Sequence, residues 1–380
     1  MTLTKADIVF EVSFEVCNKV GGIYTVVTSK AAILEQYYHQ GYFLVGPYFA
    51  QQALGEFEEK LPEGNLKKVF EDLKQEEGII CHYGKWLIKG EPEVILIDFQ
   101  SYMHKANDIK KELWEQFKVD SLRSGYDFDE PVVWSYVTGK LIEKIIKYEN
   151  KKKCVAHFHE WLSGAGILYL KSRNARVATV FQTHATILGR TLASSDVDIY
   201  ALDEKGECCT MENLDPIESA YQYNMESKYL LERRSAELSD IFTTVSEITS
   251  MEAEFLLGKK PEILLPNGLD IDKFPTFEEL SIKHKAHRDK IREFCLAYFF
   301  PNYSFDLKQS LFYFLAGRYE FHDKGIDIYI RALGKLNKKL KAKKNGKTIV
   351  AFIWVPAGIR GIKQDILENQ VHYRDINDSL

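Results

Sequence analysis

Two adjacent glycines, Gly21 and Gly22, turn the chain directly after an apolar segment, Asp7–Val16. Glycine lets the backbone come close to a ligand at a position where any Cβ atom would clash. A helix that begins at about Gly22 presents free N–H groups, which suit a phosphate or another anion. Because Lys19 adds a positive charge at the same place, this turn is a candidate phosphate site. The alternative, in which the glycines serve only the geometry of the loop, stays open.

A second polar cluster, His157-Phe158-His159-Glu160-Trp161, ends another apolar segment. On a strand, His157 and His159 project from one face and Glu160 projects from the other. No further residue has a spacing that would complete a tetrahedral metal site. We therefore expect these side chains to line a substrate or to be buried and hydrogen-bonded, and we expect no metal.

A third cluster, Thr183-His184-Ala185-Thr186, is followed by Gly189-Arg190. His184 ends a predicted strand, and Arg190 lies six residues later in the next predicted helix. An arginine clamps a phosphate through paired N–H donors. A histidine in this position would bond a sugar hydroxyl or stabilise charge. For each residue alone, a purely structural role is the alternative.

A fourth cluster is the loop Gly317–Gly325, which contains the two cations Arg318 and Lys324 and leads into a predicted helix at Gly325. Two cations and free helix N–H groups suit a diphosphate. A leaving diphosphate develops negative charge, which preorganised cations stabilise. Two such basic loops, one in each half of the chain, indicate a cleft that binds a nucleotide sugar.

Short apolar segments alternate with amphipathic ones, which predicts βαβ units with doubly wound parallel sheets. The carboxyl ends of such strands are where ligands bind. The predicted strands are Ile8–Glu15, Tyr42–Pro47, Glu93–Phe99, Cys154–His159, Val177–Thr183, Ile241–Val245, Ile263–Leu265, Leu311–Ala316 and Thr348–Val355. The predicted helices are Ile23–Tyr38, Ile109–Phe117, Pro131–Tyr148, Gly164–Ser172, Pro216–Leu238, Glu247–Leu257, Glu278–Phe299 and Gly325–Lys344.

The chain of 380 residues is long enough for two domains. The turn residues Pro266-Asn267-Gly268 predict the end of a first Rossmann-like domain, residues 1–270. Residues 271–310 are a predicted helical connection. Residues 311–380 then begin a second Rossmann-like domain, which has only two predicted strands and therefore looks incomplete.

Composition excludes several classes of protein. The net charge of −5 does not favour nucleic acid as a partner. No apolar run of about 18 residues predicts a membrane span, and a strand pattern in place of a signal peptide at the N-terminus predicts a cytoplasmic protein. The six cysteines, including the adjacent pair Cys208-Cys209, show no Cys-x-x-Cys spacing, which favours reduced thiols.

Taken together, these motifs closely resemble the animal and fungal glycogen synthases. The shared segments occur in the order of that family and span essentially all 380 residues. They are Phe14–Tyr24, Asp129–Ser135, His157–Trp161, Thr183–Thr186, Leu188–Arg190, Pro266–Leu269 and Gly317–Phe321.

The resemblance implies a two-domain glycosyltransferase of the GT-B type with its active site in the cleft. It implies transfer of glucose from UDP-glucose to the non-reducing 4-hydroxyl of glycogen, with retention of configuration and without a metal or other cofactor. Homo-oligomers are common in the family. By motif position the donor contacts would be Lys19, Gly21, Gly22, His184, Arg190, Arg318 and Lys324, of which the last four would be catalytic. Contacts with the sugar or the acceptor would be His159, Glu160 and Asn267.

The chain also departs from the family. It ends before the Glu-x7-Glu motif and the pocket for the nucleotide base, so we expect the 380 residues alone to have little or no transferase activity. A truncated, inactive paralogue that binds glycogen or a full-length subunit is the alternative. A starch synthase that uses ADP-glucose, or a phosphorylase-like enzyme, is a third option, although Lys19-Val20-Gly21-Gly22 differs from the usual bacterial Lys-Thr-Gly-Gly.

Overall fold

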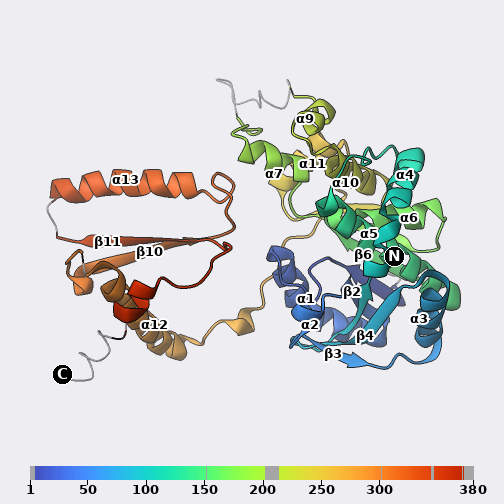
Figure 1. Cartoon of the computed structure of the whole chain (residues 1–380), viewed down its shortest axis with the longest axis horizontal. Coiled ribbons are helices and arrows are strands. Elements are labelled where there is room, and N and C mark those ends of the chain that lie inside the picture. Colours follow the sequence, from blue (N-terminus) through green and yellow to red (C-terminus); the bar gives the residue numbers. More distant parts are fainter. Residues whose placement is uncertain are drawn as a thin grey trace. The chain divides into compact units, whose positions relative to one another are not determined.

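The computed structural model describes residues 5–150, 152–201, 214–300, 302–343, 346–369 and 371, which form two compact units (Figure 1). Unit 1 comprises Met1–Leu192 and Asp198–Asp270, and unit 2 comprises Ala193–Val197 and Ile271–Leu380. In the described part of the chain, no helix is both long enough and apolar enough to cross a membrane. Cys17, Cys81, Cys154 and Cys295 are free thiols, and Cys208 and Cys209 lie outside the described residues.

Unit 1 is built on a nine-stranded sheet with the strand order β3-β4-β5-β2-β1-β6-β7-β8-β9. Most neighbours in this sheet run parallel, while β3, β4 and β5 are joined in antiparallel pairs. The strands are β1 Ile8–Val12, β2 Tyr42–Pro47, β3 Phe57–Lys60, β4 Ile80–Trp86, β5 Glu93–Asp98, β6 Cys154–His159, β7 Ala178–Thr183, β8 Ile241–Thr244 and β9 Ile263–Leu264.

The parallel part of this sheet has the doubly wound order of a Rossmann-like fold. From β1 the chain proceeds outward to β2 and β5 on one side, and it then returns to place β6, β7 and β8 on the other side. The strand order therefore reverses between β1 and β6. A crevice forms at such a switch point, outside the carboxyl ends of the strands, and it is the usual ligand site of these sheets.

Helices cover the sheet of unit 1. Val27 and Ala31 of α1 share a core cluster with Tyr42, Leu44 and residues of neighbouring strands, so α1 packs on the sheet beside β2. Helix α6 packs against both α5 and α10. The helices are α1 Gly22–Tyr38, α2 Ala50–Ala53, α3 Gly64–Glu77, α4 Ala106–Phe117, α5 Tyr126–Tyr148, α6 Gly164–Ser172, α7 Ile187–Ser194, α9 Pro216–Gln222, α10 Glu226–Leu238 and α11 Glu247–Leu257.

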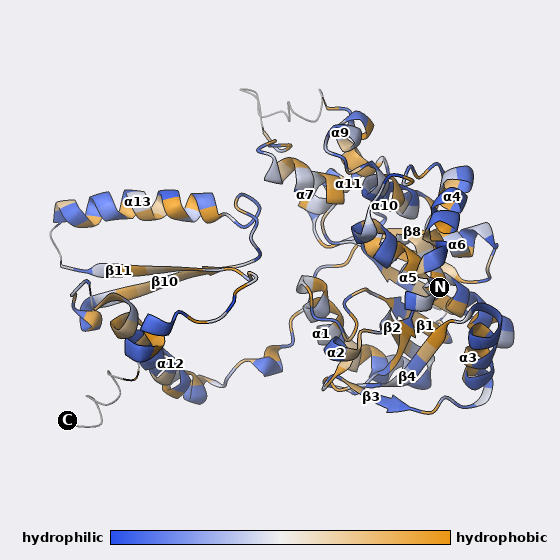
Figure 2. Cartoon of the chain, viewed as in Figure 1, coloured by the Kyte–Doolittle hydropathy of each residue, from blue (hydrophilic) through white to orange (hydrophobic). Residues whose placement is uncertain are grey.

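Unit 2 is a smaller βαβ arrangement. The parallel strands β10, Ser310–Ala316, and β11, Thr348–Trp354, form a two-stranded sheet, and α13, Ile326–Lys343, connects them. The long helix α12, Phe277–Phe299, precedes them. Both strands are rich in apolar residues along their whole length (Figure 2).

The structure confirms the α/β class and a strand at each of the nine predicted positions. It adds the antiparallel strands β3 and β4, which the sequence analysis missed. The sequence of β3, Phe-Glu-Glu-Lys, is mostly charged and exposed because the strand lies at the edge of the sheet. Edge strands often carry such charges, and their composition then resembles that of a loop.

Two helix predictions were wrong. The predicted helix Pro216–Leu238 is two helices, α9 and α10, separated by a turn in which Asn224 has a φ of 55°. A left-handed residue cannot continue a right-handed helix. Pro131 is not in a first turn, because α5 begins five residues earlier at Tyr126. The buried side chain of Phe128 secures this extra turn against the core.

Candidate active site

The polar clusters predicted in unit 1 meet at the switch point of the sheet. His159 is the last residue of β6, and His184 directly follows β7. The Gly21-Gly22 turn connects the segment after β1 to α1. Because β1, β6 and β7 are adjacent and parallel, their carboxyl ends lie along one edge, as the sequence analysis predicted for residues at strand ends.

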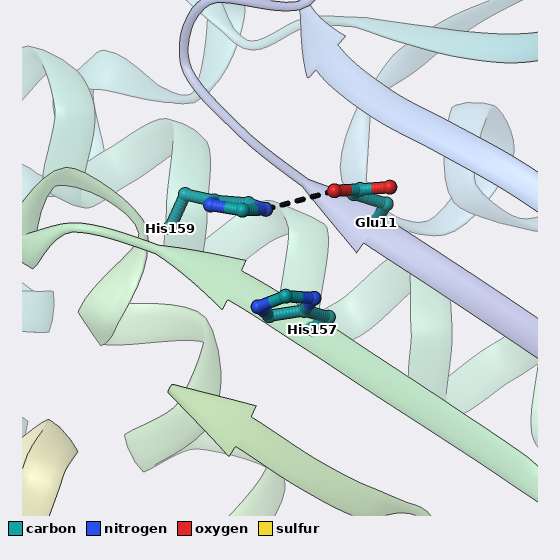
Figure 3. A group of neighbouring side chains, drawn as sticks. All are labelled: Glu11, His157 and His159. Carbon is teal, nitrogen blue, oxygen red and sulfur yellow. Dashed lines mark hydrogen bonds and ion pairs between the residues drawn. The ribbon is translucent and has the colours of Figure 1, made fainter. Parts of the chain in front are cut away.

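Two imidazoles and a carboxylate form a hydrogen-bonded chain at this edge. His159 Nδ1 lies 3.0 Å from His184 Nε2, and His159 Nε2 lies 2.9 Å from Glu11 Oε1. Figure 3 shows Glu11 on β1 beside His159 on β6. The rings of His157 and His159 stack with their centroids 4.4 Å apart, which confirms that they share one face of β6.

Glu11 is a charged residue in the core. Its carboxylate accepts hydrogen bonds from the Tyr42 hydroxyl and contacts the Lys30 ammonium group as well as His159. Burial alone would raise the pKa of Glu11, but Lys30 and the hydrogen bond from His159 together hold that pKa well below its usual range. The carboxylate is therefore ionised, and its charge is balanced inside the fold.

Glu11, His157 and His159 are also the residues in the described part of the chain that could hold a metal ion, since their ligand atoms lie within 4.8 Å of one another. The sequence analysis missed Glu11 as a third potential ligand. However, the Lys30 ammonium group contacts the same Glu11 oxygen as His159 does. That oxygen therefore already has two partners, one of them a cation, and this arrangement favours a hydrogen-bonded network over a metal site.

Glu160 organises the backbone around His184. Its buried Oε1 accepts hydrogen bonds from the amides of His184, at 2.9 Å, and Ala185, at 3.3 Å. Burial raises the pKa of Glu160, and the nearby Arg190 guanidinium opposes this rise. The backbone of Glu160 has φ 64° and ψ 167°, a region that essentially only glycine adopts without strain.

Two further buried glutamates support the same loop. Glu232 of α10 accepts hydrogen bonds from the Thr183 hydroxyl and the Ile187 amide, each at 2.8 Å. Glu252 of α11 accepts from the hydroxyl and the amide of Thr186. Burial, together with the charge of Glu160, raises the pKa of Glu232 to about 8. Three carboxyl groups therefore fix the loop that presents His184 and begins α7.

Arg190 lies in the first half of α7 and is half-buried. Its guanidinium makes no hydrogen bond or ion pair with any residue that the structure describes. It is nevertheless close enough to influence the pKa values of Glu160 and His184. A half-buried cation without a counter-ion in the described chain is suited to an anionic ligand.

The glycine turn differs from the simple phosphate loop that the sequence suggested. Glu15 Oε2 accepts hydrogen bonds from the Gly21 amide, at 2.9 Å, and the Tyr24 amide, at 2.7 Å. A Cβ atom at Gly21 would lie 2.8 Å from Glu15 Oε1, whereas one at Gly22 would meet nothing within 4 Å. The side chain of Glu15 therefore leaves no room for a Cβ atom at Gly21. The space beside Gly22 is open, so a ligand could approach the turn there. The exposed Lys19 lies over the Tyr24 ring at 5.4 Å.

The remaining predicted residues are more exposed. Asn267 lies in the loop after β9, which contacts α1 through the Gly268 carbonyl and the Ser29 hydroxyl, 3.4 Å apart. In unit 2, Arg318 and Lys324 both pair with Glu320, at 3.2 Å and 3.4 Å. The structure therefore brings His159, Glu160, His184 and Arg190 together in unit 1, and it brings Arg318 and Lys324 together within unit 2.

Comparison with known proteins identifies the family. Residues 11–380 match the family model described as "Glycogen synthase". The chain is 36% identical to the glycogen [starch] synthase of Neurospora crassa over 99% of its own length and 52% of that protein, and 37% identical to that of Dictyostelium discoideum over 98% of its own length and 41% of that protein. The chain belongs to the glycogen synthase family. It spans about half the length of the glycogen synthases that it matches.

A solved structure is similar at low sequence identity. The catalytic domain of starch synthase IV from Arabidopsis thaliana, bound to ADP and acarbose, is 14% identical, with a TM-score of 0.48, over 99% of this chain and 72% of that chain.

Four residues that belong to the hydrogen-bonded surroundings of the candidate site were missed from the sequence. Glu11, Lys30, Glu232 and Glu252 each lie on an otherwise apolar strand or helix face. For two of them, the sequence contains a pattern that could have identified them. Glu11 interrupts the buried strand Ile-Val-Phe-Glu-Val, and Glu232 shares a helical stripe with Tyr229 and Ala236. Acidic residues are almost never fully buried unless they are paired, so each marks a hydrogen-bonded site.

Proposed function

We propose that this protein is a glycogen synthase, which transfers glucose from UDP-glucose to the non-reducing 4-hydroxyl of an α-1,4-glucan with retention of configuration. Membership of the glycogen synthase family supports this assignment. The observation that carries it lies at the switch point of unit 1, where a neutral His184 is close to Arg190, a cation that has no counter-ion among the described residues. These groups suit the two parts of a nucleotide sugar. We place the reaction in the cytoplasm.

The sugar of the donor needs orientation. Burial and the neighbouring His159 lower the pKa of His184 to about 3, so its ring is neutral at physiological pH. A neutral imidazole accepts or donates a hydrogen bond to a sugar hydroxyl without placing a positive charge beside the oxocarbenium-like carbon. We assign His184 to the reacting glucose, and Glu160 and Asn267 to sugar or acceptor contacts. His159, the other residue that the resemblance assigned to such contacts, is 1% exposed and reaches the sugar only through His184.

The diphosphate of the donor needs cations. In the proposed reaction the bond between glucose C1 and the phosphate oxygen breaks, and the acceptor 4-oxygen forms a new bond to C1. The proton of the acceptor hydroxyl passes to the phosphate oxygen that leaves. Arg190, Arg318 and Lys324 would stabilise the charge of the leaving UDP, and Lys19 and the open side of Gly22 would contact the donor. Three cationic side chains supply this stabilisation without a metal.

Binding of the donor by the 380-residue chain tests this assignment. UDP-glucose would be titrated into the wild-type chain, Arg190→Ala and Arg176→Ala, with heat as the readout. Loss of one arginine–phosphate contact is expected to weaken binding roughly tenfold to a hundredfold. Arg176 is the matched control, because it is an exposed arginine before the amino end of β7. Equal binding by Arg190→Ala and the wild type, or no binding by the wild type, would reject the site.

A second titration with ADP-glucose compares the proposed donor with that of a bacterial-type starch synthase. The two donors differ only in the base, whose pocket the family carries beyond these 380 residues, so we expect this chain to bind both with similar affinity. A clear preference for ADP-glucose would contradict the proposed donor. Transfer of labelled glucose to glycogen by the 380-residue chain is expected to be small or absent, as the departures from the family predict. Measurable transfer would contradict that expectation and would show that the described residues suffice for catalysis.

A further inference from the structure

A line of polar side chains crosses unit 1 and ends at His184. It runs from Lys30 on α1 to Glu11 on β1, then to His159 on β6, and finally to His184 after β7. The proposed function uses only the last member of this line. Glu11 and His159 are 1% exposed, so neither is placed to contact a large substrate directly. Their burial in a paired network requires another explanation.

The hydrogen bonds along this line have a fixed direction. An ionised carboxylate has no proton and can only accept hydrogen bonds, so His159 Nε2 must donate to Glu11 Oε1. A neutral imidazole that is protonated at Nε2 carries a lone pair at Nδ1. His159 Nδ1 therefore accepts the hydrogen bond from His184 Nε2. A neutral His184 that is protonated at Nε2 in turn has a lone pair at Nδ1.

The groups that surround the line keep both rings neutral. Burial and the charge of Lys30 lower the pKa of His159, and burial and His159 lower that of His184. Among the described residues, His157, Glu160 and Arg190 are the other titratable groups near the two rings, and none of them makes a hydrogen bond to a ring nitrogen of His159 or His184. His184 Nδ1 has no hydrogen-bond partner among the described residues.

We propose that Glu11 and His159 are positioning residues that fix the tautomer of His184, so that its Nδ1 is held as a hydrogen-bond acceptor for a hydroxyl group of the bound sugar. Because Glu11 can only accept a hydrogen bond, it fixes the proton of His159 on Nε2. His159 Nδ1 must then accept a hydrogen bond, which fixes the proton of His184 on Nε2. This inference rests on the proposed function for the identity of the ligand. The tautomer itself is a property of the unliganded chain.

The tautomer is directly measurable. Nitrogen-15 NMR of the histidine-labelled 380-residue chain reports which ring nitrogen carries a proton, and a spectrum of His184→Gln identifies the signals of His184. We expect His184 to be protonated at Nε2 alone between about pH 5 and pH 9. A proton on Nδ1 of His184 in the wild-type chain would overturn the proposal.

A matched pair of variants then tests the cause. His159→Phe keeps a ring in place but removes the partner of His184 Nε2, and we expect both tautomers of His184 to appear. Tyr42→Phe removes a different partner of the same Glu11 carboxylate, so His184 should keep its single tautomer. Circular dichroism confirms that both variants fold. If His159→Phe misfolds, Glu11→Leu provides the same test, because it removes the acceptor that sets the direction. An unchanged tautomer of His184 in folded His159→Phe or in folded Glu11→Leu would overturn the proposal.

Calorimetry separates this inference from the proposed function. In His159→Phe we expect the affinity for UDP-glucose to fall roughly tenfold while the affinity for UDP is unchanged, because only the sugar contact is lost. An equal loss of both affinities would overturn the sugar contact. If the wild-type chain binds neither compound, the proposed function fails for this chain, and the NMR result still decides whether Glu11 and His159 set the tautomer.

Discussion

Unit 1 buries the charges that surround its candidate site, whereas unit 2 carries its candidate cations on the surface. Around His184, the carboxyl groups of Glu11, Glu160 and Glu232 are each at most 4% exposed and are hydrogen-bonded. The side chains of Arg318 and Lys324 are 47% and 39% exposed and share one glutamate. The first arrangement is held by packing, and the second by partly exposed ion pairs.

The sheets explain this difference. In unit 1, β1 and β6 have neighbours on both sides and helices packed on them. In unit 2 the two strands have no further neighbour in the described chain, and apolar side chains such as Phe314 and Trp354 are 65% and 49% exposed. An open groove of about 680 Å³ lies between α13 and β11. A two-stranded sheet is marginal without further cover, so a preorganised site is expected only in unit 1.

The largest expected contrast comes from one phenylalanine in each sheet. Phe242 of β8 and Phe314 of β10 each stack on an aromatic ring of a neighbouring strand, but Phe242 is fully buried. Phe242→Ala should reduce the free energy of unfolding by about 3–5 kcal/mol, because it leaves a cavity. Phe314→Ala should change it by less than about 0.5 kcal/mol. Chemical denaturation measures both. A large loss for Phe314→Ala would show that this face is covered in solution.

A smaller effect is expected from the buried proton of Glu232. Its pKa of about 8 lies above the value of about 4.3 in an unfolded chain, so the folded state binds a proton that the unfolded state releases between these values. The stability from this group is complete below about pH 4.3 and is lost as the pH rises through about 8. The free energy of unfolding of the wild type should therefore fall by an amount on the order of 1–3 kcal/mol as the pH rises through this range, and Glu232→Gln should not show this fall.

Denaturation midpoints at acidic and alkaline pH check this prediction. The glutamine can accept from the Ile187 amide and donate to the Thr183 hydroxyl, so the two hydrogen bonds are preserved. Parallel pH profiles for the wild type and the variant would contradict the raised pKa.

Two glycines near helix starts should differ by about 1–2 kcal/mol in their contribution to the free energy of unfolding. Gly325 of unit 2 has a φ of 66°, so Gly325→Ala should destabilise the turn before α13 by about 1–2 kcal/mol. Gly22 of unit 1 has an ordinary φ and open space around its Cβ position. Gly22→Ala should therefore leave the melting temperature unchanged but weaken binding of UDP-glucose. A destabilised Gly22→Ala variant that binds normally would assign this glycine to the fold alone.

The smallest effect is expected at Glu320. Its ion pairs with Arg318 and Lys324 are partly exposed, and pairs of this kind contribute about 0–1 kcal/mol. Glu320→Gln should change the denaturation midpoint only slightly and should become neutral at high salt. A loss as large as that expected for Phe242→Ala would mean that unit 2 is packed more tightly than its exposed strands indicate.

The sequence predicted the fold best where apolar patterns are strong. The strands β2 and β6 were predicted to the residue, because each is a buried run that begins and ends at a turn or polar residue. The strand β3 was missed because it is an exposed edge strand, and its charged residues do not form an apolar pattern. The break at Asn224 was missed because a single residue with left-handed backbone angles leaves no clear pattern in the sequence.

The site was predicted in part for the same reason. His159 ends β6, His184 directly follows β7 and Arg190 lies in the next helix, and strand ends can be found from apolar runs. Glu11 and Lys30 lie far from His159 in the sequence, and only the order of strands in the sheet brings them together. The resemblance to a family supplied roles for the residues at motif positions, but it did not reveal the carboxyl groups that hold those residues in place.

The backbone of Glu160 restricts how this chain can vary. Its φ of 64° and ψ of 167° suit glycine, yet its carboxylate holds the amides of His184 and Ala185. Glycine would relieve the backbone and lose both hydrogen bonds, and alanine would lose them and keep the strain. Almost every substitution of Glu160 should therefore reduce stability. In a saturation library, Glu160 should be among the least replaceable positions of unit 1.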